Sequence, residues 1–432
     1  MGALQLSEKP RARPVPREIG AYGKTSQMMT TNISRRPGFA QGIMLLLPIT
    51  MSVMGVAVLT PSVHLLLQHF EGVPNHDYLV MGGVLTMPAI WMFLFSPVAG
   101  WMTDRFGRRN LLLVAMVIYA VVGVAPAFLD NLYLIIATRV AVGICESIVA
   151  TVSTTMISDF YSGRTRERWL ASQTAVASVS AMGIIYVGGQ LGAAYGWRGP
   201  FYCYFYALIL AAGIYFLVWE PHADAPNVEI EASKPTRIPA FPWRRKLGIY
   251  FLTLLASVSF YTVITKNAEA LVTLGVTDPG QIGKYTLIAT SGVPFGTFIY
   301  WAISRLRTDW LLLLDFALLG TGFILMGHAT EPVSYALGSF INQVGGGIIL
   351  PTMLVWATRG LAFEVRGRGN GIWQATFAVG QFLSGMVVTF LSKHVGGLLS
   401  TLGIMGEIAL AFALCAGIIG FFYQREEPMR EF

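Results

Sequence analysis

The sequence predicts an all-α membrane protein with twelve transmembrane helices in two six-helix, pseudo-symmetric halves. Only 12% of the 432 residues are charged, about half the share in a soluble domain, and these charges gather in short segments. The apolar runs between the segments are each about 20 residues long, which is the length that crosses a bilayer. Arginine clusters recur in every second loop between the apolar runs, as they do in the cytoplasmic loops of membrane proteins.

The apolar runs predict the position of each span. We expect spans at residues 42–67, 78–101, 110–128, 132–158, 168–192, 198–219, 246–268, 280–303, 309–327, 332–356, 368–392 and 398–423. The arginine clusters lie in the connections after the second, fourth, eighth and tenth spans, at residues 104–109, 164–168, 305–307 and 359–368. The positive-inside rule therefore predicts that both termini are cytoplasmic and that the chain lies in the inner or plasma membrane.

The chain divides into two halves with polar segments around them. A segment with five prolines separates the halves, and arginines recur at an offset of 200 residues, as Arg105 and Arg305 show. Internal duplication of this kind is typical of alternating-access transporters. The predicted parts are a cytoplasmic tail (1–41), a six-helix bundle (42–219), a cytoplasmic linker (220–245), a second bundle (246–423) and a short cytoplasmic tail (424–432).

Composition argues against several other classes of protein. The net charge of +7 comes from the first forty residues and from alternate loops, so nucleic acid is not an expected partner. Cys145, Cys203 and Cys415 lie in apolar segments, and the six histidines are scattered, so we predict neither disulfides nor a metal site. No phosphate-binding motif for ATP occurs in the sequence. We expect no enzyme activity and no cofactor, and we expect the bilayer and a small molecule as partners.

The connection after the second span carries a motif. It reads Gly100-Trp101-Met102-Thr103-Asp104-Arg105-Phe106-Gly107-Arg108-Arg109, and we call it the motif loop. This stretch resembles the Gly-x-x-x-Asp-Arg-x-Gly-Arg-Arg signature of the major facilitator superfamily and lies where that family has it. The resemblance covers essentially the whole chain beyond the N-terminal tail. It implies two six-helix bundles that move a small molecule by alternating access.

The residue types in the motif loop suit a gate. Gly100 lets helices approach closely, Asp104 can pair with basic groups, and Gly107 permits a tight turn. In the family this cluster is thought to latch the two halves, and an acid at the end of the fourth span resembles its partner. The gating residues so implied are Gly100, Asp104, Arg105, Gly107, Arg108 and Asp159. The alternative is a basic loop that only sets topology.

Two ionisable residues lie inside the fourth span. Arg139 and Glu146 are seven residues apart, which places them on one helix face. Charges within a membrane are costly and mark functional sites by default. Arg139 also matches the arginine of the family's fourth-helix motif, which is associated with proton transfer. We predict that Glu146 carries a coupling proton and that Arg139 tunes it. The alternative is a buried ion pair that fixes the orientation of the helix.

The family resemblance also implies which spans surround the substrate, namely the first, second, fourth, fifth, seventh, eighth, tenth and eleventh. Aromatic and amide residues on these spans are candidates for the cavity wall: Trp91, Gln173, Tyr261, Asn342, Gln343, Trp373, Gln374 and Gln381. Hydrogen bonds between helices explain the amides equally well. With Arg139 and Glu146 the candidates predict an aromatic, amide-lined lumen with one cation and one anion, which suits an amphipathic or aromatic small molecule.

The direction of transport stays open. Exporters of the family often carry Gly-Pro-x-x-Gly-Gly in the fifth helix, and residues 184–189 keep only the paired glycines. We predict export driven by a proton gradient, by a chain that functions as a monomer. Uptake by a proton symporter or a facilitator is the alternative. A membrane sensor that binds without transport is a further one, although the C-terminal tail is too short for a signalling domain.

Overall fold

The computed structural model describes residues 37–220, 241–361 and 363–422. These ranges are helical and contain no strand. The two predicted tails lie largely outside the described residues, and so does most of the predicted linker.

Helices of the first half correspond to the first six predicted spans. They are α1 (Phe39–Leu46), α2 (Ile49–Ala57), α3 (Val63–His69), α4 (His76–Tyr78), α5 (Met87–Phe106), α6 (Arg108–Val124), α7 (Leu132–Phe160), α8 (Gly163–Tyr195) and α9 (Tyr206–Leu217). Three-residue α4 and a π-helical stretch at Leu79–Thr86 lead into α5. The 3-10 segment Gly196–Phe205 precedes α9.

Helices of the second half correspond to the last six predicted spans. They are α10 (Trp243–Thr273), α11 (Pro279–Thr290), α12 (Gly292–Ile303), α13 (Thr308–Gly327), α14 (Pro332–Thr358), α15 (Phe363–Val395) and α16 (Leu398–Phe422). Eleven stretches of the described residues are long and apolar enough to cross a membrane. One of them, Gly163–Leu217, is 55 residues long and covers the fifth predicted span and all but the last two residues of the sixth. The predicted all-helical class is therefore confirmed.

Prolines divide the first span into short helices. Pro48 separates α1 from α2, and Pro61 lies in the 3-10 turn Thr60–Ser62 that separates α2 from α3. Proline removes a backbone donor and its ring clashes with the preceding turn, so a helix breaks there. As a result α2 is a nine-residue helix bounded by a break at each end.

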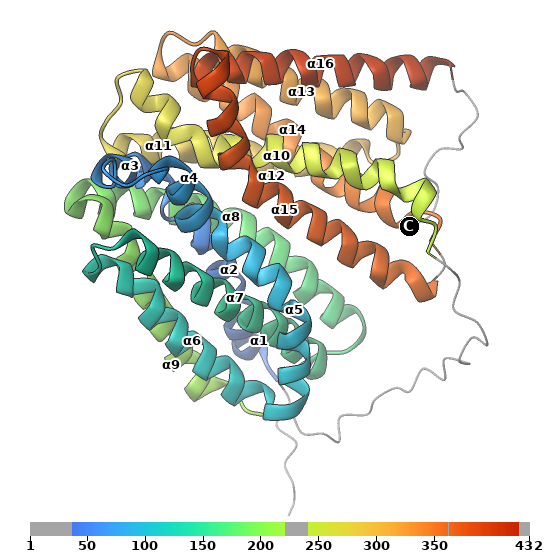
Figure 1. Ribbon diagram of the computed structural model, residues 1–432. Coiled ribbons are helices and arrows are strands. Elements are labelled where there is room, and N and C mark those ends of the chain that lie inside the picture. The colour runs from blue at the N-terminus through green and yellow to red at the C-terminus, as the bar shows by residue number, and fades with distance from the viewer. Residues whose placement is uncertain (1–36, 221–240, 362, 423–432) are drawn as a thin grey trace, which may run out of the picture. The chain divides into compact units, whose positions relative to one another are not determined.

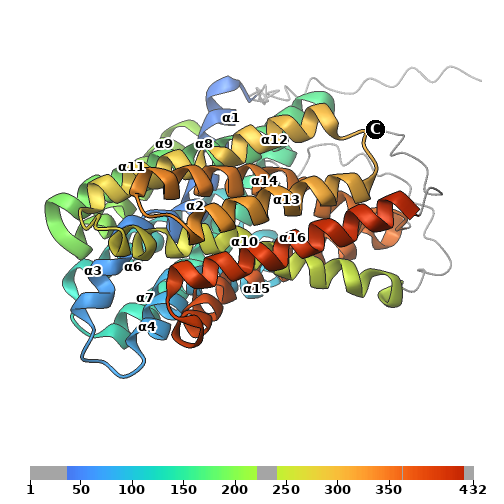
Figure 2. The ribbon, with the colours of Figure 1, turned by 90° about the horizontal axis from the view of Figure 1, so that it is seen from above.

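The two halves form separate groups of helices. In Figure 1 the blue-to-green helices α1–α9 lie in one group and the yellow-to-red helices α10–α16 in the other, and Figure 2 looks onto the second group with the first behind it. Small residues allow close packing within the second group, since a Cβ at Gly322 on α13 would lie 2.5 Å from the backbone N of Asn342 on α14. Large apolar side chains such as Phe216 and Trp301 are 80% and 76% exposed, which suits contact with lipid.

Candidate functional site

The two halves enclose a cavity between them. Its volume is about 430 Å³, within the range of roughly 300–1,000 Å³ that small-molecule sites occupy. Residues of α2, α5, α7 and α8 line it from the first half, and residues of α10, α11, α12, α14 and α15 line it from the second. These helices form the eight spans that the family resemblance implied.

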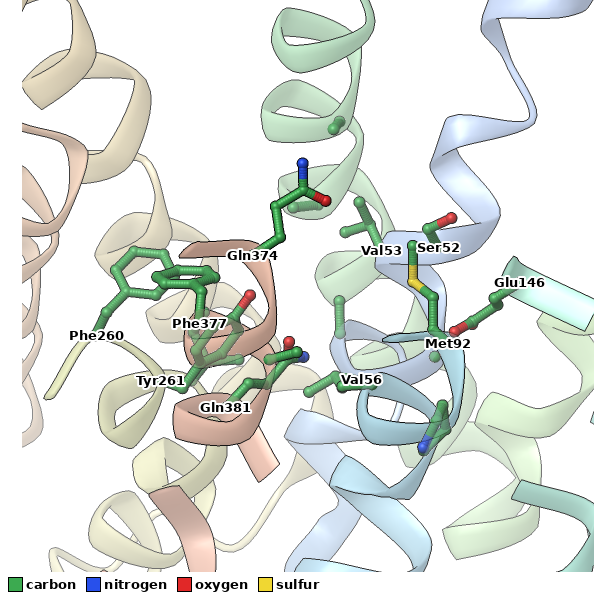
Figure 3. Close-up of a pocket in the computed structure, with 18 of the residues that line it drawn as sticks. Ser52, Val53, Val56, Met92, Glu146, Phe260, Tyr261, Gln374, Phe377 and Gln381 are labelled. Atoms are coloured by element: carbon green, nitrogen blue, oxygen red, sulfur yellow. The ribbon is translucent and has the colours of Figure 1, made fainter. Parts of the chain in front are cut away.

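The second half supplies an aromatic wall (Figure 3). Phe260 and Tyr261 on α10 lie beside Phe377 on α15, with ring centroids 6.2 and 5.4 Å from that of Phe377. Trp373, one turn earlier on α15, stacks on Phe377 at 5.5 Å with the ring planes 12° apart. The indole N–H of Trp373 has no hydrogen-bond acceptor among the described residues. The wall therefore offers aromatic faces, with the indole N–H of Trp373 as an available donor.

Two amides on α15 complete this wall. Gln374 and Gln381 both line the cavity, and Figure 3 shows them on the face of α15 that is turned toward the first half. Tyr261, Trp373, Gln374 and Gln381 are thus the predicted cavity residues that the structure brings together at the cavity.

Asn342 and Gln343 lie behind the wall and do not line the cavity. Both side chains are fully buried. The amide of Asn342 donates to Leu319 O on α13 at 2.9 Å, and that of Gln343 donates to Phe260 O on α10 at 3.2 Å. These amides hold α14 to its neighbours, which is the helix–helix alternative that the sequence left open.

Gln173 and Trp91 are also absent from the cavity lining. Gln173 exchanges hydrogen bonds with Thr154, at 3.2 and 3.4 Å, and so joins α8 to α7. Trp91 packs beside Gly143, where a Cβ would lie 2.9 Å from that of the tryptophan. Both residues face a neighbouring helix of their own half. Periodicity alone could not separate that face from the face toward the cavity.

The first half supplies the acidic side of the cavity. Ser52, Val53 and Val56 on α2, Met92 on α5 and Glu146 on α7 line it (Figure 3). Among the described lining residues, Glu146 is the only one of a charged type. The carboxyl group contacts α2 closely, because a Cβ on the neighbouring glycine of α2 would lie 2.5 Å from Glu146 Oε1.

Arg139 does not reach the cavity. It is fully buried, and its Nη2 donates to the Tyr204 hydroxyl at 3.0 Å. Its guanidinium group lies 4.9 Å from the ring centroid of Tyr204 and 5.6 Å from that of Phe201. Aromatic faces stabilise a cation that has left water, so this pocket holds the charge away from the lumen. The expectation of a cation in the lumen was wrong, since Glu146 is the one residue of a charged type that the described part of the chain contributes to the lining.

Tyr119 on α6 stands beside Glu146. Its hydroxyl lies 2.9 Å from Met51 O on α2 and 3.4 Å from Glu146 Oε1, and its ring centroid lies 5.1 Å from that of Tyr204. Sequence reasoning missed both tyrosines, because an aromatic residue in an apolar span usually belongs to the core. The available signal was the hydroxyl group, which needs a partner when it is buried in the middle of a span.

The motif loop turns the chain from α5 into α6. Gly107 has φ of +79°, a conformation that favours glycine. The backbone N–H groups of Arg108 and Arg109 donate to the carboxylate of Glu220 at 2.6 and 2.8 Å. Arg108 also forms an ion pair with Asp159 at 3.0 Å, the acid that the family resemblance named as a partner. Glu220 was missed because it was counted with the linker, although an acid suits a helix N-terminus.

The remaining gating candidates show less contact in this conformation. A side chain at Gly100 would meet open space, so the close helix approach expected there is not observed. Arg105 is exposed and lies 5.4 Å from the ring centroid of Trp101 on the same helix. Asp104 belongs to α5, and its side chain lies outside the part that the structure describes.

The end of the helices opposite the motif loop is closed by contacts between the halves. His64 Nε2 lies 3.0 Å from Thr277 O, and Asp77 forms an ion pair with Lys393. Helices α8 and α11 touch there, since a Cβ at Gly189 would lie 2.7 Å from a backbone oxygen of α11. Among the described residues a further cross-half hydrogen bond, from the Thr86 hydroxyl to Phe382 O at 3.1 Å, lies nearer the cavity, and the other contacts close this end.

Known proteins resemble this chain in sequence and in fold. The profile of the Major Facilitator Superfamily matches residues 45–359. The class C tetracycline resistance protein of Escherichia coli is 25% identical over 365 residues, which are 80% of this chain and 88% of that protein. A bacterial homologue of the human lysosomal transporter Spinster, solved in an inward-facing and unoccupied conformation, has a TM-score of 0.71 at 17% identity and covers 90% of this chain and 98% of its own. A D-xylose–proton symporter has a TM-score of 0.69 at 16% identity and covers 87% of this chain and 97% of its own.

Proposed function

This chain is a transporter of the major facilitator superfamily, and we propose that it exports a small amphipathic or aromatic molecule in exchange for protons. One observation carries the proposal: Glu146 is the only residue of a charged type among the described residues that line the cavity. A proton and a substrate that need the same carboxylate compete for it, and such competition makes exchange possible. The tetracycline resistance protein to which the chain is similar supports export as the direction.

The composition of the cavity supports the substrate class. The aromatic wall of α10 and α15 can stack a flat ring, and the amides of Gln374 and Gln381 can form hydrogen bonds with polar groups. The single carboxylate attracts a positive charge or a hydrogen-bond donor. A lipophilic aromatic cation that also carries a hydrogen-bonding group meets all three requirements, whereas the carboxylate repels a polyanion.

The proposed cycle is a rocking of the two halves around this cavity. In the described conformation the contacts at Asp77, His64 and Gly189 close one end. Substrate enters from the motif-loop end and binds beside the ionised Glu146. After the halves rock, a proton from the other side neutralises the carboxylate, and the substrate leaves. Arg139 keeps one buried positive charge near the site throughout.

The motif loop gives the proposed gate and orientation. The Arg108–Asp159 ion pair and the Glu220 cap hold the loop in shape within the first half. In the outward-facing state we expect Gly100, Asp104 and Arg105 to meet the second half and close the cytoplasmic end. Both termini are then cytoplasmic, as the arginine clusters favour. We also propose that the chain works as a monomer in the cell membrane, without enzymatic activity or a bound cofactor.

The test uses purified protein in liposomes that contain a pH-sensitive dye, under an imposed proton gradient. Tetraphenylphosphonium, tetracycline and D-xylose are added one at a time. We expect the aromatic compounds to trigger proton movement opposite to their own, and we expect Glu146→Gln to lower this flux by at least about 100-fold. Glu407→Gln is the matched control, because Glu407 is exposed on α16 and is not among the described lining residues. It should stay within about twofold of the wild type.

The result separates the alternatives. Proton movement in the same direction as the substrate would establish uptake by symport. A compound that binds without proton movement would indicate a facilitator or a sensor. Unchanged flux in Glu146→Gln would remove Glu146 from the mechanism.

A further inference from the structure

The hydroxyl group of Tyr119 has one proton and two acceptors. Met51 O lies 2.9 Å from it and Glu146 Oε1 lies 3.4 Å from it. Tyr119 is fully buried, so water does not compete for the proton. A phenol donates one hydrogen bond at a time, and the choice between the acceptors depends on how strongly each attracts the proton. The charge on Glu146 therefore decides which of the two acceptors receives the hydrogen bond from the hydroxyl.

The first acceptor belongs to α2, a helix that can respond as a unit. Breaks at Pro48 and at Thr60–Ser62 bound it. One face of α2 carries cavity-lining residues such as Ser52, and another face presents Met51 O to Tyr119. Gly55, on the same helix, lies against the carboxyl group of Glu146. A change at Glu146 therefore reaches α2 by direct contact and through Tyr119.

We propose that Tyr119 is a positioning residue that reports the protonation state of Glu146 to α2. When Glu146 is ionised, the hydroxyl donates to the carboxylate, since a hydrogen bond to a charged acceptor is the stronger one. The hydrogen bond from the hydroxyl to Met51 O is then lost, and with it this hydrogen bond between α6 and α2. When Glu146 is protonated, the hydroxyl again donates its hydrogen bond to Met51 O, and the carboxylic acid can donate to the phenol oxygen. This inference rests on the proposed role of Glu146 as proton carrier.

Few other ionisable groups surround Glu146 in the described residues. Tyr119 faces it from α6, Tyr204 contributes a second phenol from the segment before α9, and Arg139 and Cys145 lie on its own helix α7. The cavity-lining residues of α2, α5 and α8 include no ionisable side chain. Among these groups Tyr119 has a hydrogen-bond geometry that connects Glu146 to α2, whereas Tyr204 accepts from Arg139.

The experiment reads α2 directly and needs no transported ligand. Ser52→Cys places a thiol on the cavity face of α2, and its rate of labelling by a membrane-permeant maleimide is followed from acidic to alkaline pH. Peptide mass spectrometry quantifies residue 52 alone, so Cys145, Cys203 and Cys415 do not interfere. Labelling rates are divided by the rate of a free thiol at each pH, because alkaline pH speeds the reaction itself.

We expect the corrected rate to change about tenfold with pH, the effect of one hydrogen bond to a charged group. In the Ser52→Cys background, Tyr119→Phe should reduce this change to within about twofold, because the ring stays and the hydroxyl is lost. Glu146→Gln should abolish it as well. Tyr204→Phe is the matched control: it removes a hydroxyl from the same buried cluster, and the response should persist with its pH range moved.

The outcomes are distinct. If Tyr119→Phe responds to pH as the parent does, or if the parent itself shows no response, the role of Tyr119 is wrong. If Glu146→Gln still responds, Glu146 is not the titrating group and the proposed function fails at that point. Should Tyr119→Phe not fold, a ring-fluorinated tyrosine at position 119 keeps the shape and strengthens the donor. The pH range of the response should then shift, and an unshifted range would overturn the proposal.

Discussion

The two halves of this transporter bury their ionisable groups in different places. In the first half Glu146 lies on the cavity wall and Arg139 lies two turns away in an aromatic pocket. In the second half Asp315 on α13 is fully buried and is not among the lining residues, and Lys266 on α10 pairs with Glu269 at 2.5 Å. We infer that the halves divide the work: the first half holds the exchangeable proton, and the second half holds the substrate through its aromatic wall.

If proton chemistry belongs to the first half, Gly55→Ala should impair transport more than any other variant discussed below. A Cβ at this position would lie 2.5 Å from Glu146 Oε1, so either the carboxyl group or α2 must move. Overpacking of this kind costs about 1–3 kcal/mol, which corresponds to roughly a five- to 150-fold loss of proton-driven flux in the liposome assay.

The control for this variant is Gly183→Ala on α8. A Cβ there would meet open space, so flux should stay within about twofold of the wild type. Wild-type flux in Gly55→Ala would show that the contact between α2 and the carboxyl group is not needed, and it would weaken the assignment of proton chemistry to the first half.

Sequence patterns were sufficient for the fold because span length and loop charge are set by the bilayer itself. The predicted span 398–423, for example, corresponds to α16 at Leu398–Phe422. The internal breaks were not predicted, since Pro48 and Pro61 interrupt the first span without shortening its apolar run. The bounds of the two bundles as separate domains stay a prediction.

The site was only partly predictable for a physical reason. An amide such as Asn342 satisfies its hydrogen bonds equally well on a neighbouring backbone or in a lumen, and sequence spacing does not distinguish the two. Glu146 was predicted correctly because an acid inside a span is costly unless it faces the interior of the bundle or a water-filled cavity. Tyr119 was missed because its function lies in a contact with Met51 O, 68 residues away in the chain.

A smaller effect is expected from Trp373→Ala, which removes part of the aromatic wall. Trp373 stacks on Phe377 at 5.5 Å, and an aromatic contact is worth about 0.5–1.5 kcal/mol. The apparent affinity for an aromatic substrate should fall about two- to tenfold, while the number of protons exchanged per substrate stays the same.

Trp301→Ala is the matched control for that change, because Trp301 on α12 is 76% exposed and faces away from the cavity lining. The apparent affinity of the Trp301→Ala variant for the aromatic substrate should equal that of the wild type. A changed proton stoichiometry in Trp373→Ala would contradict the proposed division between the halves, since the second half would then take part in proton coupling.

The smallest effect is expected from Asp315→Asn, and this variant tests the comparison at its weakest point. A buried acid within a membrane is a functional candidate by default, and Asp315 is fully buried. Its surroundings argue for a structural role. The hydroxyl of Thr352 on α14 and the phenol of Tyr300 on α12 are polar groups near it, but the Thr352 hydroxyl donates to Ile348 O at 2.8 Å. A carboxyl group so placed is tolerated in its neutral form, and an amide has nearly the same shape. Proton-driven flux should therefore stay within about threefold of the wild type. A loss as large as that in Glu146→Gln, with the protein still folded, would place a second proton carrier in the second half, and the proposed division between the halves would be wrong.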